Sequence, residues 1–179
     1  MEGSDEQLVA KAVASGDTAA FEELVRRYQS RVRNWLRHLT HDAAQADDLA
    51  QDTFIRAWYR LGSFHGRGKF SSWLMKIAYN NFLQAVRKRT RDRRLVDELG
   101  SEEIVTAKPE DESALLDLPK MLSVLTVDER VVMTLSYAYG FSHGEIAEVT
   151  EMPLGTVKSH LRRGKAKIRE RFNLVTESE

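Results

Sequence analysis

The sequence has 179 residues, of which 42% are hydrophobic and 30% charged, so it has ample apolar material for a folded core. It contains no cysteine, which excludes disulfides, thiolate nucleophiles and cysteine-bound metals. No apolar run reaches the roughly 18 residues of a membrane span, and residues 1–6 are acidic where a secretory signal would be basic. We therefore expect a globular cytoplasmic protein without membrane insertion.

Charge is distributed in blocks, although the formal net charge is zero. Residues 1–96 hold 17 Lys/Arg against 11 Asp/Glu, and residues 97–129 hold two against ten. The stretch 153–172 holds seven against one. Two basic blocks thus flank an acidic one. Nucleic-acid binding depends on such local positive potential rather than on the net charge of the chain.

The first half of the chain is predicted to be helical, because apolar residues recur at helical spacing through residues 5–95. A first short helix ends at Ser15-Gly16-Asp17, where Asp17 or Thr18 can cap a second. The second is broken around Thr40-His41-Asp42, and a third precedes the glycine-rich loop 62–69. A fourth begins near Ser71, so no strand is expected in this half.

The second half is predicted to contain shorter helices after an acidic linker. The helical pattern is lost from Asp97 to about Glu112, a stretch that includes Pro109. Helices are expected at about 114–125, 127–138, 142–150 and 154–172. The expected fold is therefore all-α, with two small helical domains, 1–96 and 114–179, joined by a flexible acidic linker at 97–113.

A helix-turn-helix is predicted near the C-terminus. Ser142 can cap a short helix with Glu145 completing a capping box, and Ala147 allows a second helix to cross closely. Thr150-Glu151-Met152 forms the turn. Such a second helix fits the major groove of DNA. Its solvent face is expected to carry Thr156, Lys158, Ser159, Arg162, Arg163 and Lys165.

Aromatic and basic residues alternate through residues 54–94, a composition suited to single-stranded nucleic acid. Bases stack on the rings while cations meet phosphates, and the loop 62–69 can form one wall of a base pocket. Core positions are expected at Phe54, Trp58, Trp73, Ile77 and Phe82. Exposed positions are expected at Tyr59, His65, Lys69, Asn80 and Asn81.

Several runs resemble bacterial sigma factors of the extracytoplasmic-function (ECF) type. The run 47–58, beginning Asp47-Asp48-Leu49-Ala50-Gln51-Asp52, resembles the segment by which they bind the polymerase clamp. The run from Phe64 to Asn80 resembles the part that reads the −10 promoter element, and 125–165 resembles their −35-reading domain. The resemblance spans about residues 5–173 in the expected order, with no room for the further domains of larger sigma factors.

The resemblance implies a role for each run. Polymerase-binding residues would be Asp47, Asp48, Gln51, Asp52, Arg56 and Trp58. Residues contacting −10 DNA would be Phe64, His65, Arg67, Lys69, Lys76, Asn80, Asn81 and Arg87. The helix-turn-helix face would contact −35 DNA. Implied partners are promoter DNA, core RNA polymerase through its β′ clamp and β flap, and an anti-sigma factor; the acidic linker would approach the polymerase active centre.

Two other functions compete with this interpretation. A conventional helix-turn-helix regulator would bind its operator alone and as a dimer, but would leave the aromatic and basic stretch unexplained. An enzyme could use the five histidines in a metal or acid-base site, yet none shows metal-ligand spacing such as His-Glu-x-x-His. We therefore expect no catalytic residue, metal or cofactor.

Overall fold

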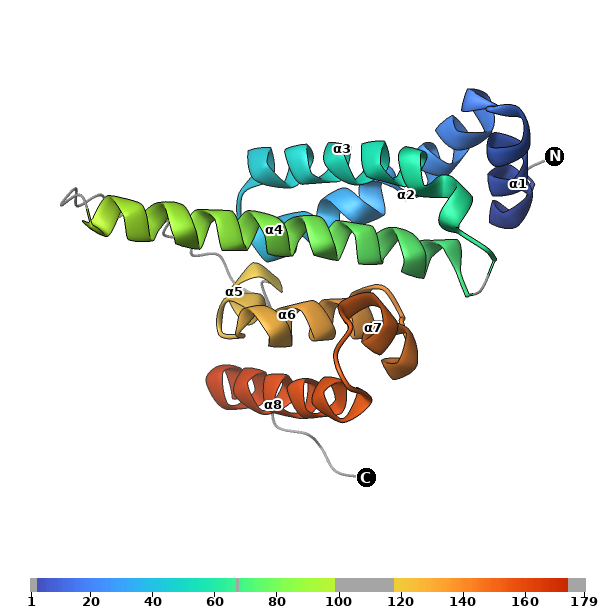
Figure 1. Ribbon diagram of the computed structural model, residues 1–179. Helices are drawn as coiled ribbons and strands as arrows, with labels where there is room; N and C mark the ends of the chain where they lie inside the picture. The colour runs from blue at the N-terminus through green and yellow to red at the C-terminus, as the bar shows by residue number, and fades with distance from the viewer. Residues whose placement is uncertain (1–2, 67, 99–117, 174–179) are drawn as a thin grey trace, which may run out of the picture.

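The computed structural model describes residues 3–66, 68–98 and 118–173, and all the regular structure in these ranges is helical (Figure 1). The α-helices are α1 (Asp5–Ser15), α2 (Thr18–Thr40), α3 (Ala43–Arg60), α4 (Phe70–Glu98), α5 (Leu118–Ser123), α6 (Val127–Met133), α7 (His143–Thr150) and α8 (Leu154–Phe172). A 3₁₀ turn, η1 (Leu61–Ser63), follows α3, and a π-helical turn, η2 (Thr134–Ala138), follows α6. The expected all-α fold is confirmed.

Local capping explains where the first helices begin and end. The Asp17 carboxylate accepts hydrogen bonds from the N–H groups of Ala19 and Ala20, at 2.9 and 3.3 Å, and so starts α2. His41 takes a left-handed conformation with φ 54° and ends that helix. Asp42 then caps α3. The predicted break between the second and third helices is therefore confirmed.

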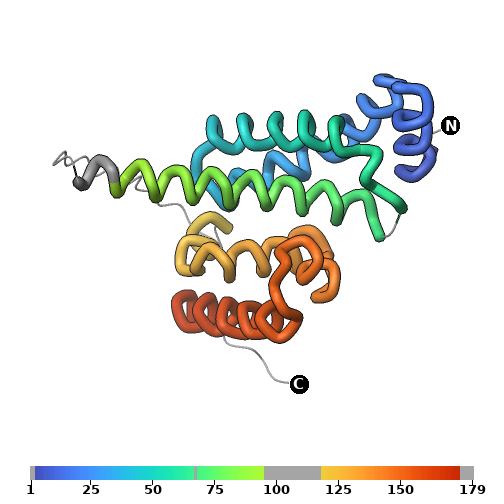
Figure 2. The backbone as a smooth tube through the Cα atoms, viewed as in Figure 1, coloured from blue at the N-terminus to red at the C-terminus, as the bar shows by residue number. Residues whose placement is uncertain are grey.

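Helices α2, α3 and α4 form the body of the first half, and α1 packs on α2 at one end (Figure 1). The core includes Trp35, Leu36 and Leu74, which have no exposed surface. The smooth tube of Figure 2 shows that α4 is one long, continuous helix, and it contains 29 residues. It continues to Glu98 and so includes the first two residues of the expected linker, Asp97 and Glu98; the rest of the linker, 99–113, lies outside the described residues.

The second half is held together by α6 and α8, with α7 across one end (Figure 1). Val157, Leu161, Gly164 and Ile168 face inward from α8 at helical spacing. Gly164 allows α8 to approach α6 closely, because a Cβ atom at this position would lie 2.9 Å from Cγ of Met133. A side chain at residue 164 would therefore require that buried methionine to move.

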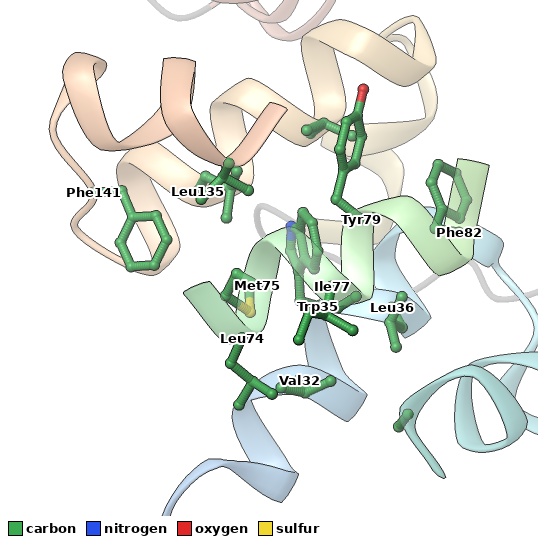
Figure 3. Packing of buried hydrophobic residues seen from close by; sticks show 14 of the residues in the cluster. Val32, Trp35, Leu36, Leu74, Met75, Ile77, Tyr79, Phe82, Leu135 and Phe141 are labelled. Carbon is green, nitrogen blue, oxygen red and sulfur yellow. The ribbon is translucent and has the colours of Figure 1, made fainter. Parts of the chain in front are cut away.

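The two halves pack against each other, a relation that the sequence left open. Helix α4 lies against α7, and α2 lies against α6 (Figure 1). Figure 3 shows Met75 and Tyr79 of α4 facing Leu135 and Phe141 across the junction, beside Trp35 of α2. All five side chains are buried, so a continuous apolar core joins the halves.

Candidate functional site

The recognition part of the helix-turn-helix is built as predicted. The Ser142 hydroxyl accepts from the N–H of Glu145 at 3.2 Å, and the Glu145 carboxylate accepts from the N–H of Ser142 at 2.8 Å. Glu151 ends α7 with a left-handed φ of 58°. Ile146 and Val157 are fully buried where α7 meets α8. The capping box and the left-handed turn residue therefore fix the angle at which α8 leaves α7.

The outer face of α8 is basic and open to solvent. Lys158, Arg162, Arg163 and Lys165 are exposed, while Thr156 and Ser159 are half-buried. Lys165 Nζ lies 5.2 Å from the centre of the Tyr137 ring, and Arg163 contacts the Nδ1 atom of His160 at 3.1 Å. These contacts leave most of the predicted −35 residues on one accessible face, with Thr156 and Ser159 at its edge.

An anionic and apolar groove lies between α2 and α3. Asp48, Gln51 and Ile55 line it from α3, and α2 contributes Val25, Gln29 and Arg33. Asp47 is held at its edge by Arg33 and Arg37, at 3.1 and 3.3 Å. This is the face predicted to grip the polymerase.

The remaining polymerase-binding candidates divide between the surface and the interior. Asp52 is exposed, and Arg56 donates to the Gln84 side chain at 2.9 Å. Trp58 packs on Phe21 with ring centres 5.0 Å apart and is half-buried. Sequence reasoning missed Ile55, whose side chain is 48% exposed; its position four residues after Gln51 places it on the same helical face.

The predicted −10 residues lie in the loop before α4 and along the first part of that helix, as far as Arg87. His65, Lys69 and Arg87 are exposed, Lys76 and Asn80 are half-buried, and Arg67 lies outside the described residues. Phe70 anchors this region, with its ring 5.5 Å from those of Phe64 and Trp73 and 5.4 Å from that of Tyr28. Packed aromatic rings therefore hold the glycine-rich loop near both of its ends, at Phe64 and at Phe70.

Two of these residues are buried. Asn81 is only 3% exposed, so the expectation of exposure was wrong. Its Nδ2 atom donates to the Thr53 hydroxyl at 3.1 Å, which places it between α3 and α4. Phe64 is also buried, against Phe70. Ile77 and Phe82 lie in the core as expected, whereas Phe54 and Trp73 are only half-buried beside it.

Hydrogen bonds and ion pairs connect the halves. Trp35 Nε1 donates to the Thr134 hydroxyl at 3.0 Å, and Arg31 donates to the Tyr139 carbonyl at 2.6 Å. The Arg31 guanidinium also lies over the rings of Tyr139 and Phe141, at 5.1 and 5.4 Å. Burial raises the pKa of Tyr79 to about 12, so its hydroxyl stays neutral at physiological pH.

Comparisons with known proteins bear on both halves of the chain. A family model described as Sigma-70 region 2 matches residues 24–92, and one described as Sigma-70, region 4 matches residues 115–168. The RNA polymerase sigma-H factor of Pseudomonas aeruginosa is 33% identical over 177 residues, which cover 92% of this chain and 91% of that protein. The chain belongs to the ECF sigma factors of the sigma-70 family.

Other relatives place this sigma factor in the same group. ECF RNA polymerase sigma factor SigW of Bacillus subtilis is 32% identical over 175 residues, covering 90% of this chain and 94% of its own length. The sigma factor RpoE from Bartonella quintana, solved with the anti-sigma factor NepR, has a TM-score of 0.72 at 28% identity, covering 86% of this chain and 97% of that one. CnrH, solved with the cytosolic domain of CnrY, has a TM-score of 0.71 at 26% identity, covering 98% and 100%. This sigma factor functions in promoter-specific transcription initiation.

The described part of the chain has neither a membrane-spanning helix nor a cluster of potential metal ligands. None of the helices within residues 3–66, 68–98 and 118–173 is long and apolar enough to cross a membrane. Nor do the same residues bring together three or more histidine, aspartate or glutamate side chains that could hold a metal ion.

Proposed function

We propose that this sigma factor binds core RNA polymerase through the α2–α3 groove and reads promoter DNA with α4 and α8. The observation that carries the proposal is the outer face of α8, where Lys158, Arg162 and Arg163 are exposed on a helix whose other face is buried. Arginine and lysine on a helix in the major groove can reach guanine edges. The helix-turn-helix would therefore bind duplex −35 DNA.

The polymerase contact is assigned to the groove between α2 and α3. Asp48, Gln51 and Asp52 provide carbonyl and carboxylate oxygens, and Ile55 provides an exposed apolar centre. An apolar centre with a charged rim is typical of a protein interface. We assign the β′ clamp as its partner and the β flap as the partner of the helix-turn-helix half, because the chain belongs to the sigma-70 family. Since that polymerase works in the bacterial cytoplasm, we place the protein there.

The start of α4 is assigned to the −10 element. Lys69, Lys76 and Asn80 offer charged and polar groups beside the packed aromatic rings at the loop. Captured bases would offset the few kcal/mol needed to unpair each one. On this mechanism the chain makes no covalent bond, so we assign it no catalytic residue. We also expect an anti-sigma factor to restrain it, as the solved complex of the relative RpoE illustrates.

In vitro transcription tests the function. Core RNA polymerase would be supplied with a genomic DNA pool, with and without this protein. We expect discrete new start sites preceded by a shared pair of sequence motifs. Absence of protein-dependent transcripts, together with tight dimeric binding to duplex DNA alone, would instead support a conventional helix-turn-helix regulator.

Alanine at Lys158 or Arg162 is expected to weaken promoter binding by about 1–3 kcal/mol, the range for a good side-chain contact to a base. Binding to core polymerase through the β′ clamp should not change, because neither residue lies near the α2–α3 groove assigned to that contact. Arg171→Ala provides the control, since it removes the same charge from an exposed site in the last turn of α8. Promoter titration and polymerase pull-down measure the two effects, and loss of polymerase binding would contradict the assignment.

A further inference from the structure

Helix α1 lies at the end of the first half where the chain turns from α3 into α4 (Figure 1). It packs on α2 and also contacts η1, the turn from which the loop before α4 begins. The residues assigned above to polymerase and to promoter DNA all lie in later elements of the chain. The proposed function therefore leaves α1 without a role.

Asp5, in the first turn of α1, joins this helix to α2. Its Oδ2 atom accepts a hydrogen bond from the Tyr28 hydroxyl, and its Oδ1 atom accepts from Nη1 of Arg27 at 3.1 Å. The side chains of Asp5 and Arg27 are only 21% and 25% exposed, so water and salt screen this contact less than one on the open surface. Burial, and then the hydrogen bond to Asp5, raises the pKa of Tyr28, so its hydroxyl keeps the proton that it donates.

Tyr28 extends this contact to an aromatic cluster formed by Phe64, Phe70 and Trp73. The ring centre of Tyr28 lies 5.4 Å from that of Phe70, which lies 5.5 Å from those of the other two. The Tyr28 side chain is therefore held at both ends, by Asp5 at its hydroxyl and by Phe70 at its ring. A ring held in this way limits the positions that the aromatic cluster can take.

We propose that α1 positions the aromatic cluster for −10 recognition, and that Asp5 and Tyr28 are the positioning residues. This inference rests on the function proposed for the start of α4. The contacts of α1 reach both ends of the loop before α4, directly at η1 and through Tyr28 at Phe70. Neither positioning residue touches DNA. They raise the fraction of molecules in which His65 and Lys69, beside the cluster, are placed for binding, and the apparent affinity follows that fraction.

Apolar packing, rather than the Asp5 hydrogen bond, keeps α1 on the body of the first half. Leu8, Val9 and Ala12 are all buried. A helix of 11 residues gains most of its stability from such tertiary packing. Removing the hydrogen bond between Asp5 and Tyr28 should therefore release the Tyr28 ring while α1 stays in place.

Transcription by the holoenzyme measures −10 discrimination. A promoter found in the genomic pool would be compared with a copy whose −10 motif is substituted, and the ratio of the two transcript yields recorded. We expect Tyr28→Phe and Asp5→Ala each to lower this ratio about ten-fold, the factor of a hydrogen bond to a charged group. The corresponding ratio for a substituted −35 motif should not change. A merely less stable protein would lower all yields together and leave both ratios unchanged.

Glu6→Ala is the matched control. Glu6 lies beside Asp5 in the first turn of α1, but its side chain is exposed and does not contact Tyr28. The control therefore removes the same charge from the same end of the helix, including its interaction with the helix dipole. An equal fall of the −10 ratio in Glu6→Ala and Asp5→Ala would overturn the proposal.

A spectroscopic measurement reports the position of the cluster without DNA. The chain has three tryptophans, so fluorine NMR of 5-fluorotryptophan protein gives three resonances, each assigned by a Trp→Phe variant. We expect Tyr28→Phe to shift or broaden the resonance of Trp73 and to leave that of Trp35 unchanged. An unchanged Trp73 resonance, or a changed one with an unchanged −10 ratio, would overturn the proposal. Absence of transcription with the wild-type protein would instead contradict the proposed function.

The double variant Asp5→Ala/Tyr28→Phe tests whether the two residues act through one hydrogen bond. Both single substitutions remove the same bond, so we expect the −10 ratio of the double variant to match that of the lower single variant. Independent effects would multiply to about a hundred-fold, the sum of two separate free-energy changes. That result would contradict a positioning role shared by this pair.

Discussion

Phe70→Ala is expected to lower the free energy of unfolding by about 3–5 kcal/mol, as large-to-small changes of buried aromatic residues do. Phe70 is 1% exposed and contacts the rings of Tyr28, Phe64 and Trp73. Its loss would leave a cavity where the glycine-rich loop meets α4. Chemical denaturation followed by circular dichroism measures the change.

The same substitution should also weaken single-stranded DNA binding, because Phe70 positions the loop that contains Lys69 and leads into the part of α4 that carries Lys76. Tyr59→Ala serves as the control, since Tyr59 is aromatic but 81% exposed, and its effect on stability should stay within about 0.5 kcal/mol. If Phe70→Ala lowers the free energy of unfolding by less than Tyr59→Ala does, this ring does not anchor the loop.

Lys167→Met is expected to destabilise the second half by about 2–3 kcal/mol at neutral pH, because it leaves a buried carboxylate without its main partner. Glu129 is 3% exposed, and its Oε2 atom accepts from Lys167 Nζ at 2.7 Å. Arg163 is more distant, at 3.8 Å, and more exposed. The lysine therefore stabilises the packing of α6 on α8.

The pH dependence of this effect has a definite sign. Burial alone would raise the pKa of Glu129, but hydrogen bonds from Lys167 and from the Thr126 backbone outweigh it and lower the pKa below the usual value. In the wild type, the resulting stability is fully present above the unfolded pKa and is lost as pH falls through the lowered folded pKa. In Lys167→Met, burial should dominate and raise that pKa.

The stability difference between wild type and Lys167→Met should therefore be largest near neutrality and shrink as Glu129 becomes protonated in acid. Thermal unfolding between neutral and acidic pH measures it. Glu129→Gln is the companion variant, because it removes the titrating group while an amide can still accept from Thr126. A difference that stays constant through the acidic range would mean that the lysine acts through packing rather than charge.

Local signals in the sequence predicted the helices and the helix-turn-helix well. Capping is a property of a few neighbouring residues, so Ser142 with Glu145, and Asp17 before α2, could be identified directly. The outer face of α8 followed from helical spacing, because its inner positions are apolar and its outer ones basic. The turn at Thr150-Glu151-Met152 was likewise predicted. Glu151 takes the left-handed conformation there, although glycine is common at that position.

Contacts between distant residues could not be predicted in the same way. Asn81 is polar and follows Asn80, yet the rotation of α4 turns it toward Thr53, which lies 28 residues earlier in the chain. The bond between Trp35 and Thr134 joins residues separated by 99 positions. No periodicity within one helix reveals such a partner, so neither the burial of Asn81 nor the buried junction between the halves was foreseen.

The Trp35–Thr134 junction also limits how far the two halves can be treated as exchangeable modules. Arg31 and Trp35 from α2 find their partners on η2 and in the Tyr139–Phe141 segment. A chimera that joins one half of this chain to the other half of a relative would separate these partners and bury mismatched groups. Grafting a new −35 specificity should therefore replace the outer face of α8 alone and leave both sides of the junction from the same parent.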